Sequence, residues 1–375
     1  MELTQELRTL AKFTSVAAPV ISIYLDTQWR DQHQRERVST FLRRHITQAR
    51  TLRLDTDDAR QSLEHDLERV AQWGQRLVAG NVDVHMPGMA LFTCHAADLW
   101  VELPASRPFE DAFILAERPA VRQLARLDED YVSALLVLID SRAARVYEVV
   151  LGDIVGEVDF SHAFPGRHKQ GGWAQMRYQR HVLEYMERHH REVAADVTSY
   201  LETHPHALLI LSGQTDIVTN FRATLSGPMQ QRIIEALRLD MHANRRHLLE
   251  AAQEVLQQHE RREEAAAVQR VIERAGQNGL AVLGLQATLA AVNTSRVHQL
   301  VMQDTALPGW RCLMCDHLLA HAVLQCPLCG GELSTTDLCE AMVSAVLRTD
   351  GAVELIEPDA HLARYEGIGA LVRYA

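Results

Sequence analysis

Four cysteines in the last quarter of the chain constrain its fold more than any other feature. They form two Cys-x-x-Cys pairs, Cys312 with Cys315 and Cys326 with Cys329, and ten residues separate the pairs. Each pair places two thiolates on one tight turn, and two such pairs at this spacing are typical of a tetrahedral four-cysteine zinc ribbon. Four thiolates fill the coordination sphere and leave no position for a catalytic water. We therefore predict a structural zinc ion.

The use of cysteine and the lengths of the apolar runs indicate in which compartment the protein acts. Cys94 stands alone, and Cys339 falls in a predicted helix over 336–347, where we expect it in the core. Paired cysteines of this kind suit a metal site in a reducing compartment. No apolar run approaches the roughly 20 residues needed to span a bilayer, and the first residues lack the layout of a secretory signal. We expect a cytoplasmic protein with no membrane contact.

A second constraint is the segment 165–180, PGRHKQGGWAQMRYQR. Two adjacent glycines, Gly171 and Gly172, let the backbone approach a ligand closely. The apolar spacing after them predicts a helix, whose first N–H groups favour negative charge. Between residues 161 and 191, six basic residues face two acidic ones, on a chain of net charge −11. A local basic segment on an acidic protein indicates a confined anionic target such as RNA backbone.

This segment resembles the central-domain loop of the archaeal and eukaryotic class I peptide release factors. In that family, a basic stretch leads into Gly-Gly-Gln and then into a helix with an Arg-aromatic-x-Arg pattern. Gly171, Gly172, Arg177, Tyr178 and Arg180 match without a gap. The chain departs from the pattern at the third motif position, which is Trp173, and Gln175 follows two residues later. The chain also resembles, in size and altered loop, the bacterial relatives of these factors and of Pelota, the baeRF group.

The apolar patterns and the resemblance together predict an α/β protein of three domains. We expect an N-terminal α/β domain over 1–125, a central domain over 131–275 with the Gly-Gly loop and a long helix, and a C-terminal α/β domain over 277–375. The resemblance implies an RNase-H-like central domain and a ribosomal-protein-like third domain, with the zinc ribbon inserted at 310–333. A continuous apolar run over 132–140 predicts a strand that is covered on both faces.

The resemblance implies a function in translation. It identifies a ribosome-binding release or rescue factor that promotes hydrolysis of the peptidyl-tRNA ester at the peptidyl-transferase centre. The implied catalytic residues are Gly171, Gly172 and Gln175. The implied contacts to RNA are Arg167, His168, Lys169, Gln170, Trp173, Arg177 and Arg180. The expected partners are the ribosome, through rRNA and peptidyl-tRNA, and a translational GTPase, and we expect a monomer.

Two other functions stay open at this point. Trp173 in place of the glutamine favours a non-catalytic occupant of the ribosomal A site, such as a hibernation factor or a factor that recruits rescue proteins. A tRNA or RNA nuclease would need metal-binding carboxylates, and Asp140 ends a predicted strand without recognisable partners. The basic run over 35–53 is interpreted as a solvated helix face. In the release factors that this chain resembles, the first domain reads the stop codon through an Asn-Ile-Lys-Ser loop. The sequence contains no such tetrapeptide, so it does not support reading of stop codons.

Overall fold

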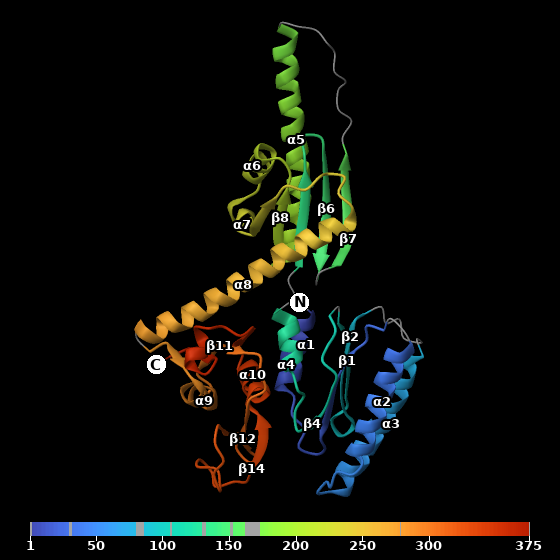
Figure 1. The fold of residues 1–375 in the computed structure, drawn as a ribbon, viewed down its shortest axis with the longest axis vertical. Coiled ribbons are helices and arrows are strands. Elements are labelled where there is room, and N and C mark those ends of the chain that lie inside the picture. Colours follow the sequence, from blue (N-terminus) through green and yellow to red (C-terminus); the bar gives the residue numbers. More distant parts are fainter. Residues whose placement is uncertain are drawn as a thin grey trace. The chain divides into compact units, whose positions relative to one another are not determined.

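The computed structural model describes residues 2–29, 32–79, 86–105, 107–129, 133–150, 153–161, 173–277 and 279–374. The chain divides into two compact units (Figure 1). The first unit combines residues 1–129 with residues 264–375, and the second comprises residues 130–263. No helix in the described part of the chain is both long enough and apolar enough to cross a bilayer.

The N-terminal part of the first unit is a four-stranded antiparallel sheet of order β3-β2-β1-β4. Its strands are β1 (Val20–Asp26), β2 (Gly88–Cys94), β3 (Leu99–Ala105) and β4 (Ala112–Ala116). Helices α2 (Gln32–Ala49) and α3 (Asp57–Val78) pack on it. Alternate residues of β1, Ile21 and Ile23, meet Leu67 and Trp73 in one core, because every second side chain of a strand points to the same face of the sheet. Thr56 accepts a hydrogen bond from the Ala59 N–H and so caps the start of α3.

The C-terminal part of the first unit is a sheet of order β10-β16-β11-β15 with a small three-stranded sheet beside it. The larger sheet contains β10 (Ala281–Leu283), β11 (Val297–Gln303), β15 (Ala352–Ile356) and β16 (Ile368–Val372). The small sheet contains β12 (Pro308–Cys312), β13 (Leu318–Leu319) and β14 (Leu333–Asp337), and helices α9 (Leu285–Asn293) and α10 (Leu338–Arg348) complete this part. Cys312 ends β12, and the other three paired cysteines lie in the connections between the strands of this small sheet.

Ion pairs join the two parts of the first unit. Helix α4 (Arg122–Glu129) presents two arginines to acids of the C-terminal part. Arg122 Nη1 lies 2.8 Å from Asp337 Oδ2, and Arg126 Nη1 lies 3.1 Å from Asp304 Oδ2. Just before α4, Arg118 Nη1 donates to Asp316 Oδ1 at 3.0 Å. These side chains are mostly shielded from solvent, so the pairs are screened less than surface pairs.

A carboxylate of the C-terminal part, that of Glu340, also binds backbone N–H groups of the N-terminal part. Its carboxylate accepts hydrogen bonds from the backbone N–H groups of Val121 (2.6 Å) and Arg122 (3.1 Å), and so caps the start of α4 from the other part of the unit. Burial raises the pKa of Glu340 to about 7, although those two N–H groups and the Arg122 guanidinium act in the opposite direction. The N-terminal and C-terminal parts are therefore joined by partly buried polar contacts as well as by packing.

The second unit is a five-stranded sheet of order β7-β6-β5-β8-β9. Its strands are β5 (Ser133–Ile139), β6 (Ala143–Val150), β7 (Asp153–Ser161), β8 (Leu208–Ser212) and β9 (Ile233–Leu237). Strands β5, β6 and β7 form an antiparallel meander, β8 is parallel to β5, and β9 is parallel to β8.

Helices cover both faces of this sheet (Figure 1). Helices α5 (Trp173–Thr203), α6 (Thr215–Thr224) and α7 (Gly227–Gln230) pack against Leu135, Val137 and Ile139 of β5. Helix α8 (Arg245–Gln277) packs its first turns against the alternate residues Leu136 and Leu138. Strand β5 is buried on both faces, which confirms the prediction made from its continuous apolar run.

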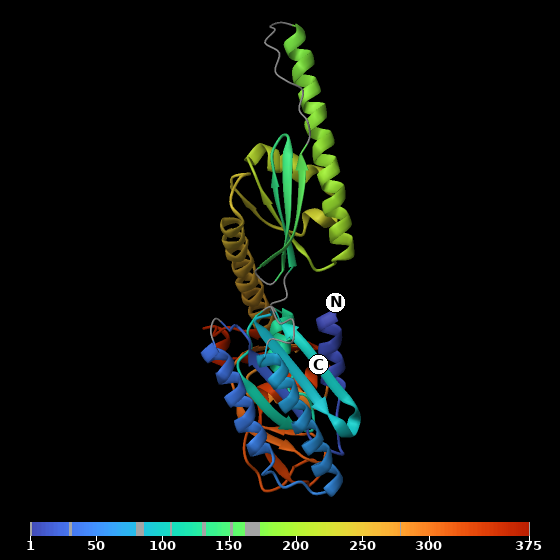
Figure 2. The same cartoon turned by 90° about the vertical axis from the view of Figure 1, so that its right-hand side faces the viewer.

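Helix α5 is much longer than the sheet that it covers. Its 31 residues span about 46 Å at the rise of an α-helix. The residues that enter the core, Val193, Val197 and Leu201, come from its C-terminal half. Figures 1 and 2 show the N-terminal half continuing past the edge of the sheet. The helix is therefore an arm, anchored at one end, that begins at the residue directly after Gly172.

Candidate functional site

The four paired cysteines converge on one point. Their Sγ atoms all lie within 4.8 Å of one another. Cys312 Sγ lies 3.5 Å from Cys329 Sγ, and Cys315 Sγ lies 3.6 Å from Cys326 Sγ. A tetrahedron of thiolates around zinc has edges of about 3.8 Å, given zinc–sulfur distances near 2.3 Å. The donor set and its spacing therefore fit a metal ion held by four sulfurs.

Glycines let the second Cys-x-x-Cys turn close around this point. Gly330 has a φ of +74°, which favours glycine, and its N–H donates to the Cys326 carbonyl at 2.8 Å. A Cβ on Gly331 would lie 3.1 Å from Cys312 Sγ, tighter than ordinary van der Waals contact. Cys339 is buried in α10 and does not belong to the converging group. The sequence predicts which four cysteines converge, because a site of this kind is encoded by local spacing.

The predicted loop lies mostly outside the described residues. This applies to the proposed catalytic residues Gly171 and Gly172 and to four of the proposed RNA contacts, at positions 167–170. Trp173, Gln175, Arg177 and Arg180 fall near the start of α5, where the structure describes the backbone and not the side chains. Helical periodicity places positions 173, 177 and 180 on one side of α5 and position 175 on the other. Gln175 is thus a helix residue on the side opposite Trp173.

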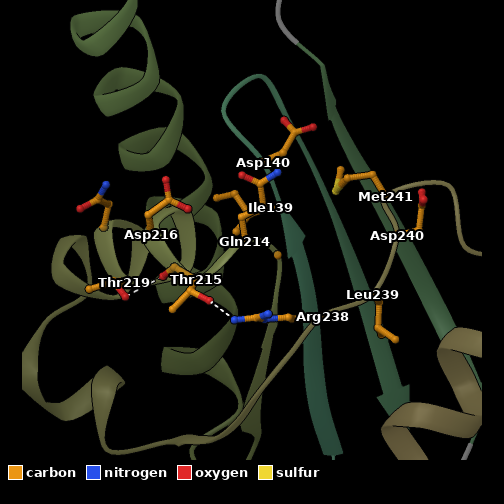
Figure 3. A pocket seen from close by; sticks show the side chains of 12 residues that line it. Ile139, Asp140, Gln214, Thr215, Asp216, Thr219, Arg238, Leu239, Asp240 and Met241 are labelled. Atoms are coloured by element: carbon orange, nitrogen blue, oxygen red, sulfur yellow. Dashed lines mark hydrogen bonds between the residues drawn. The ribbon is translucent and has the colours of Figure 1, made fainter.

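The second unit also contains an open cleft of about 1030 Å³ at the carboxyl ends of β5, β8 and β9 (Figure 3). Asp140, Asp216 and Asp240 line it. The sequence alone indicates no partner carboxylates for Asp140. The structure brings Asp216 and Asp240 to the same cleft. Even so, within the described ranges the four cysteines are the one group of three or more such side chains whose ligand atoms converge. The described acids therefore do not form the convergent metal site that a nuclease of this kind requires.

Comparison with known proteins finds a family model that matches the central part of the chain. Residues 119–257 match a family model described as bacterial archaeo-eukaryotic release factor family 10. This segment holds the loop, the arm and the whole five-stranded sheet. No curated protein matches the chain.

Solved structures of low identity align with larger parts of the chain. Pelota from Archaeoglobus fulgidus is 15% identical over 77% of this chain and 79% of its own, with a TM-score of 0.34. An archaeal Pelota in a model with the ribosome and ABCE1 is 13% identical over 99% and 94%, with a TM-score of 0.41. The archaeal translation termination factor aRF1 is 14% identical over 100% and 97%, with a TM-score of 0.27.

The assignment rests on the family model. The described part of the chain is a mixed α/β structure. More narrowly, its segment 119–257 is similar to the bacterial archaeo-eukaryotic release factors of family 10. The family resemblance predicted from the sequence is thereby confirmed for the segment 119–257, which contains the Gly171-Gly172 loop.

Proposed function

We propose that this protein is a ribosome-binding translation factor of the release or rescue type, which promotes hydrolysis of peptidyl-tRNA through its Gly171-Gly172 loop. One observation supports this most: the release-factor family model covers the segment that contains this loop. The structure adds that the helix following the loop begins on an arm of about 46 Å, beyond the sheet that anchors it. An arm of this kind suits insertion of its tip into a narrow site.

The proposed chemistry is attack of water on the ester carbonyl of peptidyl-tRNA. Backbone N–H groups after Gly172, at the start of α5, would stabilise the oxyanion, since oriented amides act without reorganising. The helix dipole adds to this effect at the same end. Gln175 would exclude or position the water.

RNA binding is assigned to the basic residues that flank the diglycine pair. Arg167, Lys169, Arg177 and Arg180 would hold phosphates, His168 and Gln170 would contact the backbone or bases, and Trp173 would stack on a base. Positions 173, 177 and 180 share one side of α5, so a single RNA surface could meet all three. The rest of the chain is acidic, which confines the interaction to this arm.

The converging cysteines are assigned a structural zinc ion, which fixes the turns that carry them. The ribbon belongs to the C-terminal part, which we propose as the third of three domains, over 277–375, after 1–125 and 131–275. By the resemblance, that domain would meet a translational GTPase. We further propose that the protein acts in the cytoplasm, as a monomer.

Trp173 favours a second candidate, a non-catalytic A-site occupant that recruits rescue proteins or protects idle ribosomes. The third motif position holds an indole where the release factors have a glutamine amide, so the side chain that would position water is replaced by one that stacks. This candidate shares the RNA contacts and the arm with the first. It differs in predicting ribosome binding without release of the peptide.

Ribosome pelleting tests the function that both candidates share. We expect the wild-type protein to co-sediment with ribosomes and the Arg177→Ala/Arg180→Ala variant to lose affinity about tenfold or more at moderate salt. Two lost phosphate contacts should also lower the slope of log K against log salt by about two. The control is Arg191→Ala/Arg246→Ala, because both arginines are exposed and paired within their own helices. Equal loss in the control and the test variant, or no binding by the wild type, would contradict the proposal.

A further inference from the structure

The cleft of the second unit lies where the connections from two neighbouring parallel strands diverge. Strand β8 leads into α6, which packs on one face of the sheet, and β9 leads into α8, which packs on the other. Open α/β sheets bind ligands in the crevice that such diverging connections leave at the carboxyl ends of the strands. Residues 139–140, 213–216, 219–220 and 238–241 line this crevice (Figure 3). Its volume of about 1030 Å³ is ample for a small ligand.

One side of the cleft is suited to a phosphate group. Gln214 is the N-cap of α6 and its side chain makes no capping hydrogen bond, so the first N–H groups of this helix lack a side-chain acceptor at the cap. Arg238 is exposed in the cleft, and its Nη2 donates to Thr215 Oγ1 at 2.7 Å. Within the described residues, Arg238 forms no ion pair with an acid. The hydroxyl of Thr215 is neutral and does not offset the positive charge of the guanidinium, which can therefore attract the phosphate of a ligand.

Two carboxylates that follow β5 and β9, those of Asp140 and Asp240, supply hydrogen-bond acceptors to the cleft. Asp140 Oδ1 accepts hydrogen bonds from the N–H groups of Arg142 and Ala143, each at 2.7 Å. Asp240 Oδ1 accepts one from the His242 N–H at 2.7 Å. These local bonds fix both carboxylates, and in the described part of the chain their second oxygens have no bond. Carboxylates at strand ends of α/β sheets commonly accept hydrogen bonds from ribose hydroxyls.

A buried imidazole beside the cleft has one nitrogen without a hydrogen-bond partner among the described residues. His190 of α5 is 1% exposed, and its Nε2 has no hydrogen-bond partner in the part of the chain that the structure describes. Its ring packs edge-on against Phe221 of α6, and it interacts with the backbone of Asp140. Burial lowers the pKa of His190, while its contact with Asp140 acts in the opposite direction. An unsatisfied polar atom next to a pocket residue is uncommon, and functional sites are one setting where it occurs.

We propose that this cleft binds a ribonucleotide, free or at the end of an RNA, with its phosphate at Arg238 and the start of α6 and its ribose at Asp140 and Asp240. The base would lie on the apolar side chains of Leu239 and Met241. Asp216 also lines the cleft, which favours a monophosphate over a more highly charged chain. The site is independent of the Gly171-Gly172 loop and of ribosome binding, so failure of either proposal leaves the other standing.

Calorimetric titration of the full chain with AMP, ATP, inorganic phosphate and a short RNA ending in CCA tests this site. We expect AMP or the RNA to bind with a dissociation constant of about 1 mM or tighter. Arg238→Ala should weaken that binding about tenfold or more, through loss of a charge-assisted hydrogen bond. The control is Arg246→Ala, an exposed arginine of the same unit paired with Glu250 at 2.8 Å. Because Arg238 is exposed, its replacement should leave thermal unfolding unchanged.

The pattern of outcomes separates the two sources of the nucleotide. Binding of AMP that falls in Arg238→Ala supports a free nucleotide, and binding of the RNA alone with the same loss supports an RNA end. In either case the imidazole resonances of His190 should shift on titration, since the ring adjoins Asp140. Absence of binding by every probe, or equal affinity of wild type, Arg238→Ala and Arg246→Ala, would overturn the proposal.

Discussion

Gly172→Ala is expected to slow peptide release from a stalled ribosomal complex by about a hundredfold, comparable to the cost of removing one oxyanion donor in other hydrolases. A methyl group at this position blocks close approach of the backbone to the ester carbonyl and disfavours a positive φ. Ribosome binding should change little, because the arginines that hold RNA are retained. The measurement is the rate of peptide release under single-turnover conditions, with ribosome occupancy held constant.

Gly227→Ala is the matched control for this variant. A Cβ at Gly227 would meet no atom within 4 Å, so the substitution should leave both folding and release unchanged. A Gly172→Ala variant that releases peptide at the wild-type rate would refute the catalytic role of the loop. Binding of wild-type protein without any release would instead select the non-catalytic A-site occupant.

Cys326→Ser is expected to remove the metal ion and to unfold the ribbon. Structural zinc sites contribute about 10–16 kcal/mol to the folding of isolated zinc fingers at neutral pH, and Cys326 is one of the two most buried ligands of the four. The metal content measured by mass spectrometry should fall from one equivalent to none, and residues 313–332 should become sensitive to protease. Chelation of the wild-type protein should produce the same change.

Loss of the ribbon should also weaken the junction within the first unit. Arg311 Nη2 lies 2.9 Å from Glu117 Oε2, and Asp316, which follows the ligand Cys315, pairs with Arg118. These contacts hold the ribbon against the N-terminal part, so Cys326→Ser should lower the melting temperature of the full chain. Cys339→Ala is the control, because that thiol is buried outside the converging group and its loss should leave one equivalent of metal. Retention of a full equivalent by Cys326→Ser would contradict the assignment.

Local patterns explain which features the sequence predicts. The cysteine ligands follow from two short spacings, and strand β5 follows from an uninterrupted apolar run that can only be covered on both faces. The start of α5 after Gly172 follows from apolar spacing and from the absence of glycine and proline up to Pro205. Each of these features depends on residues that are close in the chain.

The features that the sequence does not reveal depend on distant residues. Asp140, Asp216 and Asp240 lie far apart in the chain, and only the parallel alignment of β5, β8 and β9 brings them to one cleft. The contact of Glu340 with the N–H groups at the start of α4 joins positions about 220 residues apart. Neither the acids nor that glutamate stands in a recognisable motif. Strand-terminal acids at the carboxyl ends of parallel strands were the one pattern that could have indicated the cleft.

The central claim is that the diglycine loop enters the peptidyl-transferase centre. A photoreactive amino acid at position 170, on the loop, and one at Gln258, exposed on α8 and hydrogen-bonded to Glu254, provide a matched pair of probes. After irradiation of ribosome complexes, the adduct at position 170 should map to large-subunit rRNA of the peptidyl-transferase centre, and the adduct at position 258 should not. Cross-links from position 170 to the protein's own chain alone, or to RNA outside that centre, would contradict the account.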